Sequence, residues 1–248
     1  MGNCLVTQLK SAVDNSGLKK LGVFEIKHYG YAPNTLMVFN IDANKPISLK
    51  IVSGDALFDE DISHVTYSAD RKEVFLQANY SYSNSVRATS GSKGGDIFID
   101  VSDKYAVTRF GNYMGNNDTE DFEFMENLTE LACVPGRDIH GDISFLRRLT
   151  NLKDLCLNSV GSVIDTTLTG DISSFSALKN LETIQCLRCA GLTGNLNALL
   201  DNLHAAGKRG SLSVNFRYCT NIQYTGTTDI HSLIVSFTFD NSGWRESQ

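Results

Sequence analysis

The sequence predicts a mixed β and α/β fold, in which an N-terminal β-sandwich-like module precedes a short solenoid of repeats. Two observations lead to this prediction. One apolar pattern, L-x-x-L-x-L followed by a G-D-I-S-like turn, recurs in the C-terminal half. Short β-branched and aromatic runs separated by turn formers fill the N-terminal half. The change of period predicts four regions: an N-terminal segment (1–22), a β-rich module (23–115), an acidic linker (116–126) and a repeat module (127–248).

The β-rich module is predicted from runs that favour strands. Seven short runs at this spacing, separated by turn formers such as Ala32-Pro33-Asn34, indicate an antiparallel sandwich or barrel. Two stretches, 55–61 and 83–95, have loop composition, and the second is rich in serine and glycine. The predicted strands cover 23–26, 36–41, 47–52, 64–67, 73–80, 97–101 and 105–110.

The repeats share their inward apolar positions and their turns. The first leucines, at 128, 152 and 181, are 24 and 29 residues apart, within the range of about 20–29 residues of leucine-rich repeats. The predicted core positions are Leu128, Leu131 and Cys133, then Leu152, Leu155 and Leu157, then Leu181, Ile184 and Cys186. The predicted turn positions are Gly141, Asp142, Gly170, Asp171 and Gly194.

Stacking explains why such a pattern must repeat. The last two apolar residues of L-x-x-L-x-L point to one face of a short strand, and one repeat cannot bury that face alone. Neighbouring repeats therefore form a parallel sheet with one core. The return segments 144–149, 173–178 and 197–203 carry apolar residues about every third position, which suits a 3₁₀ turn or a short helix.

A degenerate fourth copy follows if Ser211, Val214 and Phe216 take the same positions. This register places Cys219 eight residues after the first position, as Cys189 is eight after Leu181. The consensus has Asn or Cys there, so the Cys186-x-x-Cys189 spacing is better explained by two repeat positions than by a metal or redox site. The alternating run 233–239 then predicts a strand that caps the end of the solenoid.

Composition limits the classes of function. The formal charge of −6 disfavours nucleic-acid binding, which needs a basic face. No window reaches the roughly 20 apolar residues of a membrane span, and the N-terminus has no signal-peptide pattern. Six cysteines scattered over 248 residues do not indicate a disulfide scaffold, so we expect reduced, metal-free thiols.

Catalytic patterns are weak, and the sequence predicts no enzyme, cofactor or metal. The histidines lie in different elements, without the spacing of metal ligands. Asp142 and Asp171 recur in register, which is typical of helix N-caps and Asx turns rather than of paired catalytic carboxylates. The acidic cluster Asp55, Asp59, Glu60 and Asp61 lacks the EF-hand spacing, so a solvated loop is favoured over a calcium site, which stays an alternative.

The N-terminal sequence carries a family likeness. MGNCLVTQLKSAVDNSGLKKLG, with its Leu-Val-Thr-x-Leu-Lys core, resembles the N-termini of short proteins encoded by gut Bacteroidales and by their tailed phages, the crAss-like phages among them. The GDIS-type repeats, as in Leu168-Thr169-Gly170-Asp171-Ile172-Ser173, are similar to repeats of the same proteins. The resemblance implies a virion structural protein, most plausibly a fibre or decoration protein on the capsid (head) or tail.

Several expectations follow for this chain. The N-terminal segment, with Leu5, Val6 and Leu9 among its apolar residues, is expected to attach the protein to other virion proteins; the alternative is that it is the first strand or helix of the β-rich module. We expect a symmetric homo-oligomer, located on the virion after assembly in the host cytoplasm, with no nucleic-acid or membrane partner. The competing class is a tail fibre or a bacterial leucine-rich-repeat protein that binds a ligand, such as one on a host surface.

Overall fold

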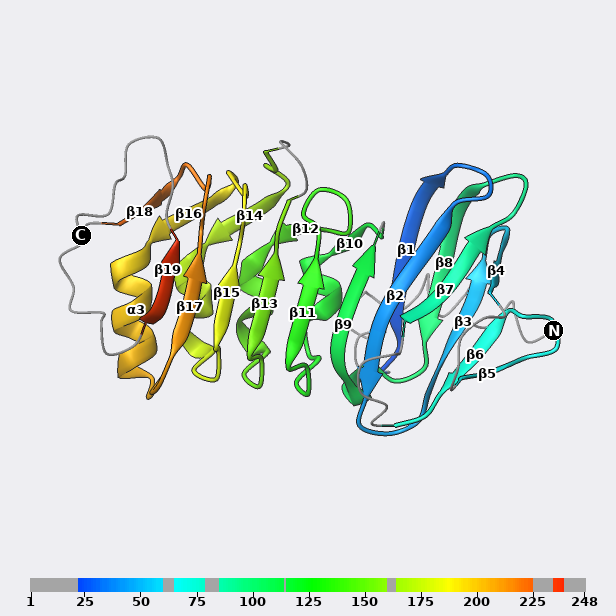
Figure 1. Cartoon of the computed structure of the whole chain (residues 1–248), viewed down its shortest axis with the longest axis horizontal. Helices are drawn as coiled ribbons and strands as arrows, with labels where there is room; N and C mark the ends of the chain where they lie inside the picture. The colour runs from blue at the N-terminus through cyan, green and yellow to red at the C-terminus, as the bar shows by residue number, and fades with distance from the viewer. Residues whose placement is uncertain are drawn as a thin grey trace, which may run out of the picture.

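The computed structural model describes residues 22–59, 65–78, 85–113, 115–159, 164–224 and 234–238. Antiparallel sheets make up the N-terminal side of these residues, and parallel sheets with short helical turns make up the C-terminal side (Figure 1). The mixed β and α/β class predicted from the sequence is confirmed at this level. The two sides are named here the antiparallel module and the repeat segment.

The antiparallel module has two layers. One is a sheet with the strand order β1-β8-β3-β6-β5, and the other contains β4, β7, β2 and β9 in adjacent positions. All pairings within these layers are antiparallel. The elements are β1 (Phe24–Tyr31), β2 (Leu36–Ala43), β3 (Ile47–Ser53), β4 (Ala56–Phe58), β5 (Val65–Tyr67), β6 (Glu73–Leu76), β7 (Ser85–Ser90), β8 (Gly95–Val101), the 3₁₀ turn η1 (Lys104–Ala106) and β9 (Val107–Tyr113).

Alternating burial explains most of these strands, and it also corrects two predicted loops. In β3, Ile47, Leu49 and Ile51 are buried while the residues between them are not, as a strand with one covered face requires. β4 and β7 lie inside the stretches 55–61 and 83–95, so these are not loops throughout. Small residues hide the alternation of β7, whose inward positions include Ala88 and Ser90.

β9 belongs to both parts of the molecule. On one edge it pairs antiparallel with β2, with Phe110 opposite Ile41. On the other edge it pairs parallel with β11 (Glu130–Cys133), with Phe110 opposite Leu131. One nine-stranded sheet therefore runs through both parts of the molecule in the order β19-β17-β15-β13-β11-β9-β2-β7-β4 (Figure 1).

The parallel half of that sheet keeps the register that the sequence predicts. Leu131, Leu155, Ile184 and Val214 are aligned across four consecutive strands. The further strands are β13 (Asp154–Leu157), β15 (Thr183–Gln185), β17 (Leu212–Asn215) and β19 (Ile234–Thr238). β19, which lies within the predicted strand 233–239, pairs parallel with β17 at the end of the sheet.

A second parallel sheet of very short strands runs alongside, in the order β10-β12-β14-β16-β18. Each of the first four strands leads directly into a helical turn, so the return segments are helical as predicted. The strands are β10 (Asn117–Asp118), β12 (Ile139–Asp142), β14 (Leu168–Asp171), β16 (Leu192–Asn195) and β18 (Ile222–Gln223). The turns are η2 (Thr119–Phe122), η3 (Ile143–Arg148), η4 (Ile172–Ala177) and the helix α3 (Leu196–Ala205).

Residues 116–126 do not have the structure of a linker. They contain β10 and η2, and Asn117, Phe122 and Met125 are fully buried. The acidic residues misled the prediction because Asp118 and Asp121 form a capping box at the start of η2 instead of facing solvent as a spacer. With β9 before them, these residues complete the first turn of the repeat segment.

The buried apolar residues of both parts form one core cluster. Phe24 of β1, Phe110 of β9 and Phe122 of η2 meet where the two parts join, with ring centroids 5.2–5.3 Å apart. Aromatic pairs at this separation add to the gain from burial. The junction is therefore packed like the interior of a single domain.

Candidate functional site

The predicted repeat-core residues face inward. Leu128, Leu131, Leu152, Leu155, Leu157, Leu181, Ile184, Cys186 and Cys189 are fully buried, and Cys133 is 4% exposed. The fourth copy holds at Val214, Phe216 and Cys219, which are also buried. Its first position differs, because Ser211 is exposed and the neighbouring Leu212 is buried instead. These residues build the core, and none offers an accessible binding group.

The glycine and aspartate of each turn form a ladder between neighbouring repeats. Gly141, Gly170 and Gly194 have positive φ, and a Cβ at Gly170 would stand 2.6 Å from the Asp142 carboxylate of the previous turn. The Asp142 and Asp171 carboxylates accept the backbone N–H two residues ahead, each at 2.8 Å. The turn needs glycine because a Cβ there would collide with the capping aspartate of the previous turn. The aspartates themselves are structural N-caps.

Asn117-Asp118 is one more copy of this turn, which the sequence did not reveal. By register, β10 pairs with β12 as each later strand pairs with its successor, so Asn117 occupies the position of Gly141. Asp118 caps η2 by accepting the Glu120 N–H at 3.0 Å. The available signal was the D-T-E-D capping box, but glycine is missing from this copy.

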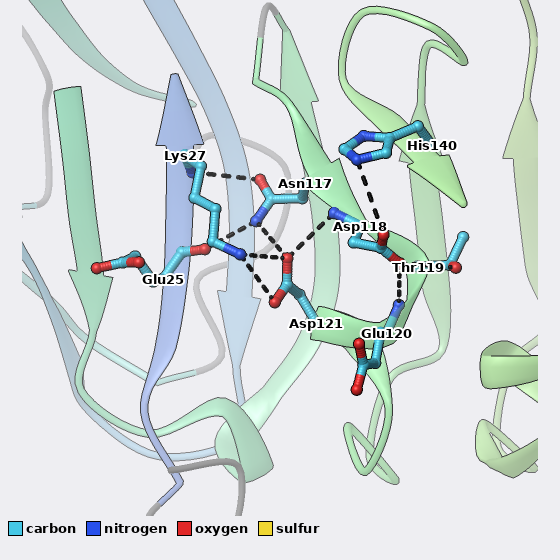
Figure 2. A network of polar contacts seen from close by, with 8 residues as sticks. All are labelled: Glu25, Lys27, Asn117, Asp118, Thr119, Glu120, Asp121 and His140. Atoms are coloured by element: carbon cyan, nitrogen blue, oxygen red, sulfur yellow. Dashed lines mark hydrogen bonds and ion pairs between the residues drawn. The ribbon is translucent and has the colours of Figure 1, made fainter. Parts of the chain in front are cut away.

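Asn117 links this first turn to the antiparallel module (Figure 2). Its side-chain amide donates to the Glu25 carbonyl at 2.7 Å and accepts the Lys27 N–H at 3.4 Å, so it satisfies the open edge of β1 as a neighbouring strand would. The backbone N–H of Asn116 donates to the Lys27 carbonyl at 2.7 Å. Asparagine therefore takes the place of glycine at the turn that hydrogen-bonds to the edge of β1.

An ion pair reinforces the same junction. The Lys27 ammonium contacts both carboxylate oxygens of Asp121, at 2.9 and 3.1 Å, and Asp121 also accepts the Asp118 N–H (Figure 2). Burial by itself lowers the pKa of Lys27, but the charge and hydrogen bond of Asp121 outweigh it, and the pKa is raised. His140 lies 3.7 Å from Asp118 at the rim of this network. We name these contacts the junction network.

A ladder of asparagines runs along the edge of the repeat segment. Asn180 donates to the Thr150 carbonyl at 2.8 Å and Asn151 donates to the Glu126 carbonyl at 2.7 Å. Asn127 continues the series to the Tyr105 carbonyl at 2.6 Å. Because Tyr105 precedes β9, the repeat pattern of backbone contacts extends into the antiparallel module.

Four of the five cysteines in the described part of the chain occupy inward repeat positions, and the fifth, Cys156, lies on the outward face of β13. Cys133, Cys156, Cys186, Cys189 and Cys219 are free thiols. Cys189 donates to the Leu157 carbonyl at 3.2 Å, and Cys219 donates to the Cys186 carbonyl at 2.6 Å, so each thiol binds the preceding repeat. Burial raises the pKa of Cys133 and Cys186 well above its usual value, which keeps both thiols neutral. The Cys186-x-x-Cys189 spacing is thus explained by stacking.

The outward face of the parallel sheet is polar and ends in an arginine–tyrosine stack. Arg188 and Arg217 lie over the ring of Tyr218, at 4.7 and 4.9 Å from its centroid. Arg188 and Tyr218 both have positive φ, so the backbone of these equivalent loops fixes the stack. Nearby, Asn158 donates to Gln185 at 3.1 Å. Arg188, Arg217 and Tyr218 are all partly exposed, so this stack is accessible to a partner.

The structure separates the residues of the predicted acidic cluster that it describes. Asp55 accepts the Lys93 N–H at 3.2 Å and Asp59 accepts the Thr89 hydroxyl at 2.8 Å, at opposite ends of β4. Glu60 and Asp61 lie outside the described residues. Across the described part of the chain, no three His, Cys, Asp or Glu side chains gather as a metal site would require. His28 is buried against the rings of Tyr31 and Phe39.

None of the helices in the described ranges has the length and apolar character needed to span a membrane. The predicted attachment residues Leu5, Val6 and Leu9 lie outside the described residues. Comparison with known proteins found no family model, no curated protein and no solved structure that matches this chain.

Proposed function

We propose that residues 127–248 are a leucine-rich-repeat solenoid with a C-terminal capping strand, preceded by a β-sandwich-like module. Support comes from the shared register of Leu131, Leu155 and Ile184 and from the thiol of Cys189, which binds the previous repeat where the consensus places Asn or Cys. One further turn precedes residue 127 and begins at β9, the strand that this solenoid shares with the antiparallel module.

We further propose that the protein is a non-enzymatic virion structural component, a capsid (head) fibre or decoration protein. It attaches through its N-terminal region and displays the repeat module. The observation that carries this proposal is the shared strand β9, with the junction network beside it, because together they fuse two modules into one stiff body. A display protein needs such stiffness to hold one module at a fixed distance from its support. The likeness of residues 1–22 to phage proteins supplies the location.

Attachment has a direct test. The full chain and residues 23–248 are each produced in cells that assemble the particle, and copies per purified particle are counted by quantitative mass spectrometry. We expect the full chain on the particle and the truncated chain in the soluble fraction, with the repeat module still folded, as a cooperative thermal melt would show. Replacing Leu5, Val6 and Leu9 by Ala should act as the truncation does.

A matched control is Ser11→Ala, a substitution in the same segment that leaves its apolar residues intact and should preserve incorporation. Truncated chains at full occupancy would show that attachment lies elsewhere. Immunogold labelling with an antibody to this chain then separates the head from the tail. Light scattering of the purified chain measures the expected homo-oligomer directly.

The second candidate is a tail fibre or a bacterial leucine-rich-repeat protein that binds a ligand. The arginine–tyrosine stack favours it, because Arg and Tyr dominate the energetics of protein interfaces. Under this alternative, Arg188→Ala abolishes adhesion of the protein to its target cells while incorporation into particles is unaffected.

A further inference from the structure

A cleft lies between the antiparallel module and the first repeat. Its volume is about 290 Å³, at the small end of the range for ligand sites. One wall is the end of β1 and the turn that follows it, with Tyr29, Tyr31 and Thr35. A second wall is the loop before β12, with Gly136 and Arg137. Gly115 and Asn116, just before β10, complete the lining and are called its floor.

Both walls are fixed before any ligand arrives. The turn after β1 is held by Ser90, whose hydroxyl donates to the Ala32 carbonyl and accepts the Thr35 N–H, each at 2.8 Å. In the other wall, a Cβ on Gly136 would stand 2.2 Å from the Asp165 carboxylate, so this loop packs tightly on the next repeat. The hydrogen bond from Asn116 to Lys27 fixes the floor. A preformed site loses little entropy on binding.

The charges in the cleft favour a neutral ligand. Arg137 supplies the one guanidinium among the lining residues, and its Nε lies 3.4 Å from the buried carboxylate of Asp138. An anion would compete with Asp138 for Arg137, and a cation would be repelled by the Arg137 guanidinium. The terminal nitrogens of Arg137, the amide of Asn116 and the hydroxyl of Thr35 suit a ligand that carries several hydroxyl groups.

Aromatic rings supply the apolar part of the surface. Tyr29 is 50% exposed, and its ring packs edge-on against Phe98 of β8 with centroids 5.5 Å apart. Val52, 44% exposed, lies on the same outward face of this sheet. An apolar surface that includes the Tyr29–Phe98 ring pair therefore extends along the outward face of the sheet. Burial and the nearby Asp138 raise the pKa of Tyr31 to about 12.

We propose that this cleft binds one ring of a neutral saccharide, with the Tyr29 ring against the apolar face of the sugar and Arg137 and Asn116 bound to its hydroxyls. Sugar rings combine one apolar face with a rim of hydroxyl groups, which is the combination that the lining residues match. The Tyr29–Phe98 surface next to the cleft takes the adjoining residue of a longer glycan. This site is independent of how the protein is attached to a particle.

The test is ligand-observed NMR on the full chain. Saturation-transfer difference spectra are recorded with methyl glycosides of glucose, galactose, mannose, fucose, rhamnose and N-acetylglucosamine, and each hit is titrated by calorimetry. Adenosine and glucuronic acid are included as a flat aromatic competitor and an anionic one. We expect at least one neutral glycoside to bind, with Tyr29→Ala and Arg137→Gln each weakening it about tenfold or more, which corresponds to at least 1.4 kcal/mol.

Two control variants match these substitutions. Phe75→Ala removes another exposed aromatic ring from the outward face of the same sheet, and Arg87→Gln removes an exposed arginine outside the cleft; both should leave the affinity unchanged. Thermal melts of all four variants confirm folding. The proposal is overturned if no neutral glycoside binds, if binding is insensitive to Tyr29→Ala and Arg137→Gln, or if adenosine or glucuronic acid binds in preference.

Discussion

The two parts of this protein build their sheets by different rules. In the antiparallel module, β1 and β3 both pair with β8, and β2 pairs with β7 and β9, so most of its strands depend on partners far along the chain. In the repeat segment, each strand pairs with the next copy, 24–30 residues away, at the aligned positions 131, 155, 184 and 214. The first part is specified by long-range pairing and the second by one local rule applied repeatedly.

The comparison explains why the two parts are joined through β9. A stack of repeats exposes its first strand and its first core layer unless a different structure covers them. β9 covers the edge of β11, and Phe24 of β1 covers the core beside Phe122. The antiparallel module is therefore the N-terminal cap of the repeats. The junction network lies at the boundary between the two parts, which we call the seam.

The largest expected effect comes from breaking the core of the repeat segment. Leu155→Ala removes a fully buried side chain between two neighbouring strands, and it should lower the free energy of unfolding by about 2–5 kcal/mol. Urea unfolding followed by circular dichroism measures this. Lys153→Ala is the control, because Lys153 is exposed and makes only a solvent-exposed ion pair with Glu182; its effect should stay within about 0.5 kcal/mol. Equal midpoints for Leu155→Ala and the parent would contradict the shared core.

The sequence predicts the repeat segment better than it predicts the antiparallel module. Leu131, Leu155 and Ile184 were predictable because identical spacing forces identical environments. β4 and β7 were not, because alanine and serine at inward positions do not produce a visible alternation. The Lys27–Asp121 pair spans 94 residues and has no sequence signal. Asn117 was missed because its role is to satisfy the edge of β1, which appears only when the antiparallel module is folded beside it.

An intermediate loss of stability should come from breaking the hydrogen bonds of Asn117 at the seam. Asn117→Ala removes the amide that serves the Glu25 carbonyl and the Lys27 N–H, and leaving buried backbone groups unpaired should cost about 1–3 kcal/mol. Urea unfolding measures the loss. Asn180→Ala is the matched control, since its amide also serves a carbonyl of the preceding turn but at an exposed position, so its loss should be smaller.

The order of these two asparagine variants decides whether the seam differs from an ordinary repeat contact. If Asn180→Ala costs as much as Asn117→Ala, the first turn is merely another repeat and the antiparallel module is not its cap. If Asn117→Ala splits unfolding into two transitions, the seam is what makes the two parts unfold together.

The smallest expected effect is a difference in alkaline sensitivity. Burial raises the pKa of Cys133 and Cys186, whereas residues 22–113 contain no cysteine. Below the unfolded pKa, near 9, both states keep these protons and the stability is fully present. Above it the unfolded thiols ionise first, so the free energy of unfolding falls as pH rises, by at most about 1.4 kcal/mol per pH unit for each thiol.

Urea unfolding with a phosphine reductant at pH 7.5, 8.5 and 9.5 separates the contributions of the two parts. Cys186→Ala should reduce the loss of stability between pH 8.5 and 9.5, because one of the thiols that ionise only in the unfolded chain is gone. Tyr31→Phe should leave it nearly unchanged, since this tyrosine loses its proton in the unfolded chain only near its ordinary pKa of 10.0, above the pH range tested. An identical pH slope for the parent and Cys186→Ala would show that the alkaline sensitivity arises outside the repeat core, and the contrast between the two parts would then rest on pairing alone.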